Sequence, residues 1–308
     1  MNEIFSAGEL IGSPEVFSRV EPPVCLGVFG DPVAHSKSPG FHNAALEALR
    51  IPARYARIHV TSGQLTGALR ALPSAGFFGV NVTIPHKAAA LSVVDTADDY
   101  ALRAGGVNTV VVEGSRLLGF NTDGPGFVRA IRDDFSVDLR DLRVVLLGAG
   151  GGAGRAIAVQ CAIESCERLV LVNRTFEKAA ALASELEGSF RADRLLGPAD
   201  RIVAVPMDGP ALKTHLEQAD LVINATSVGM RRTDPVLIPS AWLTANLMVY
   251  DAVYASGMSR LLEDAAAAGA RTANGLSMLL HQGALSFEIW FNKPAPLDVM
   301  RAALFATA

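Results

Sequence analysis

Cysteine is scarce in this sequence, and long apolar runs are missing. The 308 residues include three cysteines, Cys25, Cys161 and Cys166, and no two of them form a C-x-x-C pair. A sparse, odd count is typical of a reducing cytoplasm and argues against a disulfide framework or a zinc site. We therefore expect a cytoplasmic protein whose thiols are small core residues. No run approaches the roughly 18 uninterrupted apolar residues of a transmembrane helix, so no membrane span is expected.

Positive charge is scarce as well. The 27 Lys and Arg residues stand against 31 Asp and Glu, which gives a net charge of −4, and no basic block occurs. Nucleic-acid-binding surfaces need such a block, so nucleic acid is not an expected partner. The N-terminus MNEIFSAGEL carries acids where a secretory signal needs positive charge. Histidines, cysteines and acids show no metal-ligand spacing, so no metal is expected.

Apolar residues, in contrast, are plentiful and recur in a pattern. They make up 50% of the chain, and its 308 residues suggest two domains. Short apolar runs, such as VCLGVFG at 24–30 and RVVLLGAG at 143–150, alternate with helical patterns. This alternation predicts an α/β fold of parallel sheets covered on both faces. NTVVV and RLLGF, on either side of EGS, predict a hairpin.

A domain boundary is expected near residue 125, where the glycine-bearing NTDGPGF leads into the helical pattern FVRAIRDDF. The tail LSMLLHQGALSFEIWF, at 276–291, has the periodicity of a long helix. Its apolar surface is too large to stand alone, so we expect it to pack back against a domain.

A glycine-rich turn in the second half points to a nucleotide. In VVLLGAGGGAGRAIA, Gly148, Gly150 and Ala153 fit G-x-G-x-x-[GA] between a predicted strand and a predicted helix. Glycine lets the backbone approach a pyrophosphate, and the helix N-terminus offers N–H groups to it. The alternative is a glycine-rich turn without a ligand. The candidate contacts are Gly148, Gly150, Gly151, Gly152 and Ala153.

The end of the next predicted strand indicates which nucleotide binds. NAD-binding domains carry an acid there for the ribose 2′-hydroxyl. Here RLVLVN ends in Asn173, followed by Arg174, Thr175 and, one turn on, Lys178. A guanidinium can bind a 2′-phosphate that a carboxylate would repel, so the pattern favours NADP over NAD. Alternatively, Arg174 and Lys178 are solvated charges and Thr175 is a helix N-cap.

NVTIPHK, at 81–87, follows an apolar run and raises the question of a site. A nicotinamide enzyme that oxidises an alcohol needs a group to take the hydroxyl proton, and a lysine can do so where its surroundings depress its pKa. Lys87 is the candidate, with Asp123 in NTDG as its orienting partner. A surface lysine and an N-cap aspartate are the alternatives, and spacing alone does not decide between them.

The sequence resembles the shikimate/quinate dehydrogenase family over roughly residues 24–300. The motifs that carry the resemblance are GDPVAHSKSPGFHNAAL, GVNVTIPHK, AGGVNT, GFNTDGPG, GAGG, NATSVGM, VYDAVY and GLSMLLHQGALSFEIW. The resemblance implies a mixed-sheet substrate and catalytic domain over 1–125, with 1–23 as an extension, and a Rossmann NADP-binding domain over 126–274. The helices of 275–308 would return to the substrate domain, and the active site would lie in the cleft between the domains.

The resemblance also implies roles for individual residues. Lys87 and Asp123 match the catalytic pair, and Ser36 and Ser38 match hydroxyls that hold the substrate carboxylate; a loop leading to a helix cap is the alternative for these serines. Met278 is either on the nicotinamide side or a core residue. The remaining substrate-binding candidates are Asn81, Thr83, Asn108, Tyr254 and Gln282, and the remaining cofactor-binding candidates are Thr226, Ser227, Gly229, Met230 and Gly275. His35, His42 and His86 are expected to be structural or exposed.

The expected activity is therefore NADP-dependent interconversion of 3-dehydroshikimate and shikimate in aromatic amino acid biosynthesis. The alternative is a quinate dehydrogenase or a dual quinate/shikimate dehydrogenase. A non-catalytic ligand sensor is a rival from another class, but it would not need a proton-transfer pair. We expect a monomer or a homodimer.

Overall fold

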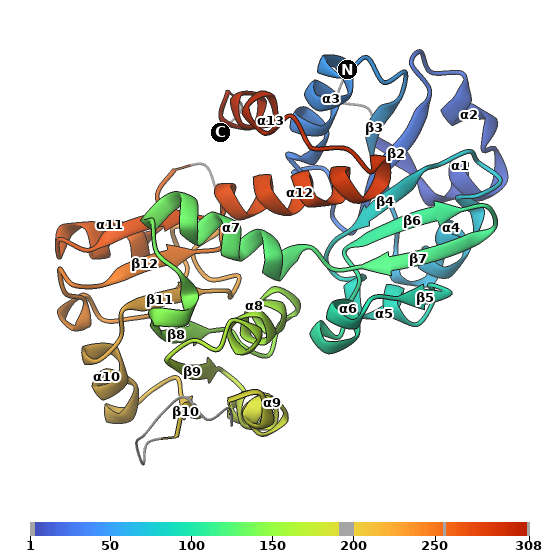
Figure 1. Cartoon of the computed structure of the whole chain (residues 1–308). Coiled ribbons are helices and arrows are strands. Elements are labelled where there is room, and N and C mark those ends of the chain that lie inside the picture. Colours follow the sequence, from blue (N-terminus) through green and yellow to red (C-terminus); the bar gives the residue numbers. More distant parts are fainter. Residues whose placement is uncertain (1–3, 191–199, 255–256, 307–308) are drawn as a thin grey trace. The chain divides into compact units, whose positions relative to one another are not determined.

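Figure 1 shows a computed structural model of the chain, which describes residues 4–190, 200–254 and 257–306. The chain forms two compact units. Unit 1 contains Met1–Gly126 and Leu279–Ala308, and unit 2 contains Phe127–Met278. The divisions fall within two helices, α7 (Asp123–Phe135) and α12 (Leu276–Phe291).

Unit 1 is built on a seven-stranded sheet of order β1-β3-β2-β4-β6-β7-β5. Its strands are β1 (Ile4–Ser6), β2 (Val24–Gly30), β3 (Arg54–His59), β4 (Gly79–Val82), β5 (Thr96–Ala97), β6 (Thr109–Glu113) and β7 (Arg116–Phe120). β6 pairs antiparallel with both β4 and β7, and the other pairs are parallel. The predicted hairpin is confirmed. The sheet as a whole is mixed, as the family resemblance implied, and the alternation of runs alone did not predict this.

Helices cover the sheet of unit 1 (Figure 1). They are α1 (Ala7–Gly12), α2 (Glu15–Ser18), α3 (Ser38–Ala48), α4 (Leu65–Ala71), α5 (Lys87–Leu91) and α6 (Asp99–Ala104), and α13 (Leu297–Phe305) packs on α3. One core cluster joins strand residues such as Ile58 and Val80 to α1 and α4. Neighbouring strand positions face the opposite way, where Tyr55 contacts the rings of His42 in α3 and Trp290 in α12.

The N-terminal segment before β2 completes this unit. β1 adds a parallel strand beside β3, and Ser6 forms a capping box with Glu9 at the start of α1. Phe5, Leu10 and Phe17 are buried in the core cluster. These three side chains give the segment a packing role in unit 1.

Unit 2 contains a six-stranded, fully parallel sheet of order β10-β9-β8-β11-β12-β13. Its strands are β8 (Arg143–Leu147), β9 (Arg168–Asn173), β10 (Ile202–Pro206), β11 (Leu221–Asn224), β12 (Met248–Asp251) and β13 (Arg271–Asn274). The order reverses at β8, which is the arrangement of the Rossmann fold. The predicted parallel sheet is confirmed here.

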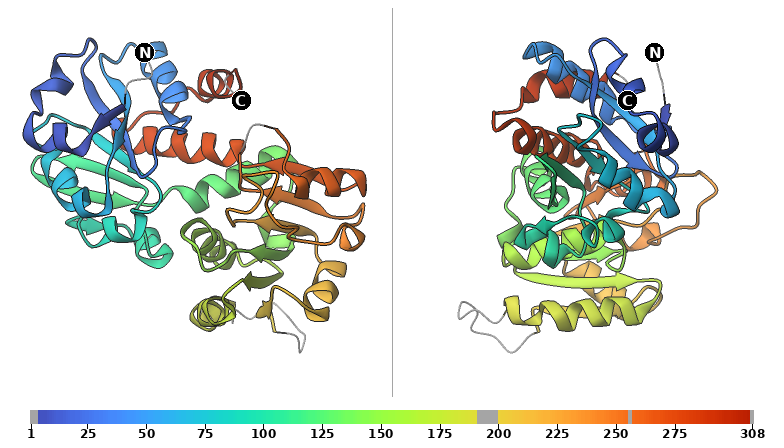
Figure 2. Two further views of the ribbon diagram at one scale, coloured as in Figure 1. Left: turned by 180° about the vertical axis from the view of Figure 1, so that it is seen from behind. Right: turned by 90° about the vertical axis from the view of Figure 1, so that its right-hand side faces the viewer.

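The helices of unit 2 are α8 (Gly152–Ile163), α9 (Phe176–Leu186), α10 (Pro210–Glu217) and α11 (Arg260–Ala267), and Figure 2 shows them from two further sides. α10 and α11 bury leucines against alternate residues of the strands, including Val145 and Val222. β8 therefore lies in the interior, and its carboxyl end leads directly into the glycine-rich turn.

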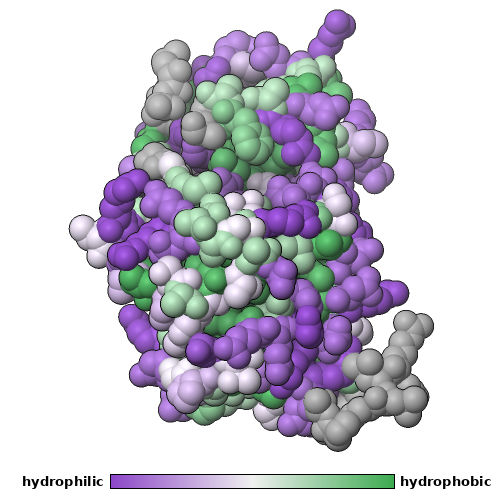
Figure 3. Space-filling model, turned by 90° about the vertical axis from the view of Figure 1, so that its left-hand side faces the viewer, coloured by the Kyte–Doolittle hydropathy of each residue, from purple (hydrophilic) through white to green (hydrophobic). Residues whose placement is uncertain are grey.

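The surface carries apolar residues among hydrophilic ones on the face shown in Figure 3, which is usual for a globular protein. No helix in the described ranges is long and apolar enough to cross a membrane.

Candidate active site

The NVTIPHK motif ends in Lys87, whose backbone is fixed on both sides. After β4 the chain turns and starts α5 at Lys87. His86 is buried, and its Nε2 lies 2.6 Å from the Val60 carbonyl oxygen, so this nitrogen donates the hydrogen bond. The Val107 N–H donates to the Lys87 carbonyl at 2.9 Å. His86 is thus structural, as expected, and Lys87 is held firmly.

The Lys87 side chain forms an ion pair with Asp123. Its Nζ donates to Asp123 Oδ2 at 2.7 Å, and the two side chains are 20% and 5% exposed. A freely solvated surface lysine would not show this burial. Asp123 is the first residue of α7, and its own N–H donates to Asn121 Oδ1 at 3.0 Å. Its carboxylate lies at a helix N-terminus, where negative charge is favoured.

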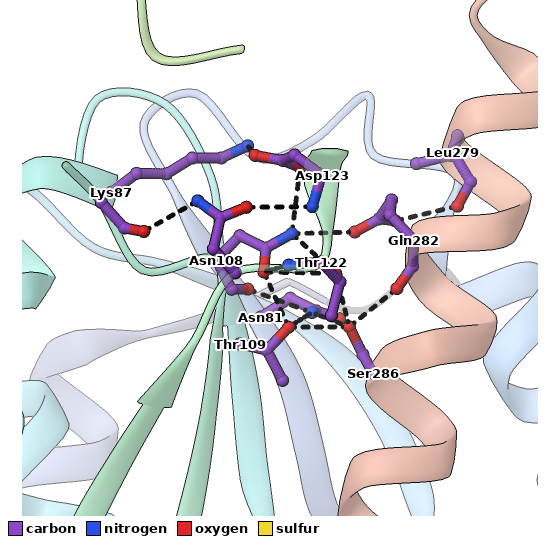
Figure 4. A network of polar contacts seen from close by, with 11 residues as sticks. Asn81, Lys87, Asn108, Thr109, Thr122, Asp123, Leu279, Gln282 and Ser286 are labelled. Atoms are coloured by element: carbon purple, nitrogen blue, oxygen red, sulfur yellow. Dashed lines mark hydrogen bonds and ion pairs between the residues drawn. The ribbon is translucent and has the colours of Figure 1, made fainter. Parts of the chain in front are cut away.

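Asn108 holds the second oxygen of that carboxylate (Figure 4). Its Nδ2 donates to Asp123 Oδ1 at 2.9 Å. Its Oδ1 accepts the Thr122 N–H at 2.8 Å and the Thr109 hydroxyl at 2.9 Å. Because a backbone N–H can only donate, Asn108 must turn its oxygen toward Thr122 and its amide hydrogens toward Asp123. Both oxygens of Asp123 are therefore committed to named donors.

The β6–β7 hairpin brings this cluster together. It places Thr109 opposite Phe120, so the two Asn-Thr pairs, 108–109 and 121–122, meet at one edge of the sheet. Asn81, at the same edge, donates to the Asn108 carbonyl at 3.1 Å and to Ser286 Oγ of α12 at 2.9 Å.

Gln282 joins the cluster from α12. Its Oε1 lies 3.3 Å from Asn108 Nδ2. The helix can come this close because residue 126 is glycine: a β-carbon there would lie 2.8 Å from Gln282 Cβ. Asn81, Asn108 and Gln282, all proposed to contact ring hydroxyls, thus lie together with Lys87 and Asp123.

The segment HSKSP, at 35–39, carries Ser36 and Ser38 and leads into α3; we call it the serine loop. Ser36 Oγ accepts the Ser38 N–H at 3.3 Å, which leaves the Ser36 hydroxyl hydrogen able to donate. Ser38 is 6% exposed and is the first residue of α3. Thr83 is half-buried beside Gly30, where a β-carbon would lie 2.6 Å from Thr83 Cγ2. All three residues belong to unit 1, as do the five polar residues above.

The glycine-rich turn of unit 2 is closely packed at two of its glycines and open at the start of α8. Gly148 has φ +87°, and a β-carbon there would lie 2.8 Å from Thr226 Cγ2. At Gly150 a β-carbon would lie 2.9 Å from Lys178 Cβ. Gly151 is the N-cap of α8, whose first N–H groups have no partner within the helix. A β-carbon on Gly152 would have no atom within 4 Å, so the start of α8 is open.

The close contact between helix and strand occurs at Gly154, which the motif reading did not select. A β-carbon on Gly154 would overlap the Gly148 carbonyl oxygen, whereas Ala153 is half-buried and does carry one. The tight position therefore lies one residue later than G-x-G-x-x-[GA] predicts, at 154 and not at 153.

The end of β9 lies beside this turn. Asn173 Nδ2 donates to the Thr175 carbonyl at 2.9 Å, and Arg174, Thr175 and Lys178 are exposed. Thr175 is the N-cap of α9, but its side chain makes no capping hydrogen bond. Two cations and a hydroxyl thus stand where NAD-binding domains place an acid.

A buried carboxylate anchors the loop of Thr226, Ser227, Gly229 and Met230. Asp251, fully buried at the end of β12, accepts from Asn224 Nδ2 at 2.9 Å and from Ser259 Oγ at 2.5 Å. Asn224 Oδ1 in turn accepts the Thr226 hydroxyl at 2.7 Å. Burial raises the pKa of the Asp251 carboxyl. The sequence reading passed over Asn224 and Asp251, although NATSVGM and VYDAVY contain them.

The remaining candidates of unit 2 differ in exposure. A β-carbon on Gly275 would overlap the Ala252 carbonyl, so this glycine is required by close backbone packing. Met278 is 7% exposed, which supports the core-packing alternative for it. Tyr254, proposed to bind substrate, belongs to unit 2 and is 37% exposed. Among the described residues there is no group of three or more histidines, cysteines or acids that could hold a metal.

The fold, the polar cluster around Lys87 and Asp123 in unit 1, and the glycine-rich turn of unit 2 define an α/β oxidoreductase. It has a Rossmann-like NAD(P) domain and a separate substrate domain. Comparison with known proteins identifies the family. Residues 28–110 match the shikimate dehydrogenase substrate binding domain, 130–234 match shikimate/quinate 5-dehydrogenase, and 275–305 match the shikimate 5′-dehydrogenase C-terminal domain.

Individual relatives agree. The shikimate dehydrogenase (NADP(+)) of Methanopyrus kandleri is 41% identical over 281 residues, which cover 91% of this chain and 94% of that relative. A crystal structure of a shikimate dehydrogenase in complex with NADP+ has a TM-score of 0.83 and 32% identity, covering 92% of this chain and 94% of that one. The Thermus thermophilus enzyme, in complex with NADP(H) and shikimate, has a TM-score of 0.81 and 35% identity, covering 92% and 100%. The chain belongs to the shikimate dehydrogenase family.

The serine loop gives a first prediction. Ser36→Ala and Ser38→Ala should each weaken shikimate binding by about 1–2 kcal/mol, the value of a hydrogen bond to a charged acceptor, and should leave NADP affinity nearly unchanged. Isothermal titration with each ligand measures both. Ser92→Ala, which removes an exposed hydroxyl bonded to the Ala89 carbonyl, is the control. Unaltered shikimate affinity in the double variant would remove these serines from the site.

The residues after β9 give a second prediction. Arg174→Ala should raise the KM for NADP about tenfold or more and change the KM for NAD little, because a charge-assisted contact of roughly 1.5–3 kcal/mol is lost. Arg140→Ala, an exposed arginine elsewhere in unit 2, should change neither. A wild type that uses both cofactors equally well would contradict the assignment of Arg174.

Proposed function

We propose that this chain catalyses the NADP-dependent interconversion of 3-dehydroshikimate and shikimate, a step in aromatic amino acid biosynthesis. The observation that carries the proposal is the Lys87–Asp123 pair at 2.7 Å, set among the buried amides of Asn81 and Asn108. A ligand sensor can bind a polyhydroxylated ring with amides alone. A half-buried ammonium paired with a buried carboxylate adds the means to move a proton.

Lys87 carries the proton in this proposal. During reduction the ammonium donates a proton to the carbonyl oxygen as that oxygen becomes a hydroxyl. During oxidation the neutral amine takes the hydroxyl proton. Asp123 orients the amine and stabilises its charged form, and Asn108 keeps Asp123 in place. Bound NADP supplies the nicotinamide carbon that accepts or returns the hydride.

The substrate is oriented by neutral donors. Ser36 and Ser38 bind its carboxylate through hydrogen bonds, which requires no buried ion pair. Asn81, Asn108, Thr83 and Gln282 bind the ring hydroxyls. Tyr254, from unit 2, is proposed as a further contact. An analogue that lacks one of these hydroxyls would leave a buried polar side chain without its hydrogen-bond partner. These residues therefore also give specificity against such analogues.

NADP is the cofactor, and the residues of unit 2 fit it. Gly148 and Gly150 allow the tight packing of the turn, and the open positions of Gly151 and Gly152 let a pyrophosphate approach the backbone at the start of α8. Arg174 contacts the 2′-phosphate, with Thr175 and Lys178 beside it. The loop from Thr226 to Met230 and the turn at Gly275 lie toward the nicotinamide in this proposal.

A cytoplasmic location and a monomeric or homodimeric state complete the proposal. The three free thiols, of which Cys161 and Cys166 are buried, suit a reducing compartment. Light scattering coupled to size exclusion measures the oligomeric state.

The decisive variant is Lys87→Ala. General acid–base catalysis is typically worth about 10²–10⁴-fold, so kcat should fall at least about a hundredfold while shikimate affinity changes much less. Lys87→Arg should rescue poorly, because a guanidinium keeps its proton. Asp123→Asn should also slow turnover, and the double variant should lose less than the sum of the two effects.

Wild-type turnover is measured first, with shikimate and with quinate, each with NADP and NAD. The highest kcat/KM should be for shikimate with NADP. Higher kcat/KM for quinate would assign the rival substrate, and no turnover of either would support a sensor. If Lys87→Ala raises KM and spares kcat, Lys87 only anchors a hydroxyl.

A further inference from the structure

Two residues of β3, Tyr55 and Arg57, lie on the side of the sheet that faces the serine loop. Tyr55 and Arg57 point to the same face of the sheet, because side chains alternate along a strand. Tyr55 is 1% exposed, and its ring stacks on His42 with centroids 4.3 Å apart and planes inclined by 10°. Burial lowers the pKa of His42 to about 3, so this imidazole is neutral at physiological pH. The phenol ring is thereby fixed in the core.

The hydroxyl of Tyr55 connects two proposed substrate contacts. Asn81 Nδ2 faces the Asn108 carbonyl oxygen at 3.1 Å, and a carbonyl can only accept. Asn81 Oδ1 therefore faces Tyr55, and the phenol donates to it at 2.7 Å. The phenol hydrogen is therefore used, and the phenol oxygen remains able to accept. Burial raises the pKa of Tyr55, and the nearby Ser38 hydroxyl opposes that rise.

Arg57 holds the other serine. Its Nε and Nη2 donate to the Ser36 carbonyl oxygen at 3.0 and 2.6 Å. This two-point contact fixes the peptide that carries the Ser36 hydroxyl. The guanidinium is half-buried and keeps its charge at any physiological pH. A positive charge thus stands directly behind a loop whose serines offer neutral donors.

We propose that Tyr55 and Arg57 are positioning residues for the carboxylate end of the substrate. Tyr55 places Ser38 and Asn81, and Arg57 places Ser36 and adds positive charge that favours an anion over a neutral ligand. Neither is assigned a contact with the substrate. This inference rests on the proposed function, since it assumes an anionic ring bound at the serine loop.

The test compares shikimate with its neutral methyl ester. Arg57→Gln should lower kcat/KM for shikimate about tenfold or more, mainly through KM, and that for the ester about threefold or less. Tyr55→Phe, which keeps the ring stacked on His42, should lower the preference for the anion about three- to tenfold. Arg57→Lys keeps the charge and loses the two-point contact, so it should fall between wild type and Arg57→Gln, and it replaces Arg57→Gln if that variant does not fold.

Arg54→Gln is the matched control. Arg54 also lies on β3 and also donates to a backbone carbonyl, that of Glu21 at 3.1 Å, but from the opposite face of the sheet. The Arg54→Gln variant should keep the wild-type preference for shikimate over its methyl ester. Equal losses on both substrates in the Arg57 and Tyr55 variants, or no loss, would overturn the positioning role. Failure of wild type and Arg54→Gln to oxidise shikimate would instead overturn the proposed function.

Discussion

The buried amide of Asn108 cannot turn over, because the Thr122 N–H and the Thr109 hydroxyl both donate to its oxygen. Its hydrogens must therefore face the Asp123 carboxylate, and that carboxylate in turn holds the Lys87 ammonium. The direction of each hydrogen bond follows from the one before it. The Lys87 ammonium, the proposed proton-transfer group, is thus oriented through the N–H of Thr122, two residues after the end of β7.

Such a cluster is costly to bury unless nearly every polar atom has a partner. The hairpin, the end of β4 and α12 supply those partners, and Gly126 lets α12 come close enough to take part. Unit 2 meets a similar requirement at Asp251, whose buried carboxyl accepts from Asn224 and Ser259 and so anchors the loop proposed to lie toward the nicotinamide. In both units a conformationally restricted amide links a buried acid to a strand end.

Periodicity predicted most strands of the two sheets, and β2, β9 and α12 have the predicted bounds, but β1, β5 and β13 were not predicted. Local pattern could not show that the sheet of unit 1 is mixed, because strand direction depends on distant pairing. The Lys87–Asp123 pair is separated by 36 positions, so the residues alone suggested the pairing without deciding it, and the family resemblance strengthened it. Tyr55, Arg57 and Ser286 went unnoticed because they sit inside ordinary strand and helix patterns. Gly154 was missed because the glycine turn is one residue longer than the motif.

The most direct test of the central claim is a crystal structure of the wild-type chain with shikimate and NADPH, an unreactive pairing of alcohol and reduced cofactor. The account predicts that Lys87 Nζ and one oxygen of Asp123 lie within about 2.6–3.2 Å of the same ring hydroxyl, the one borne by the carbon that exchanges hydride. It also predicts the substrate carboxylate at Ser36 and Ser38. A hydroxyl at that carbon held by other side chains, with Lys87 turned away, would contradict the account.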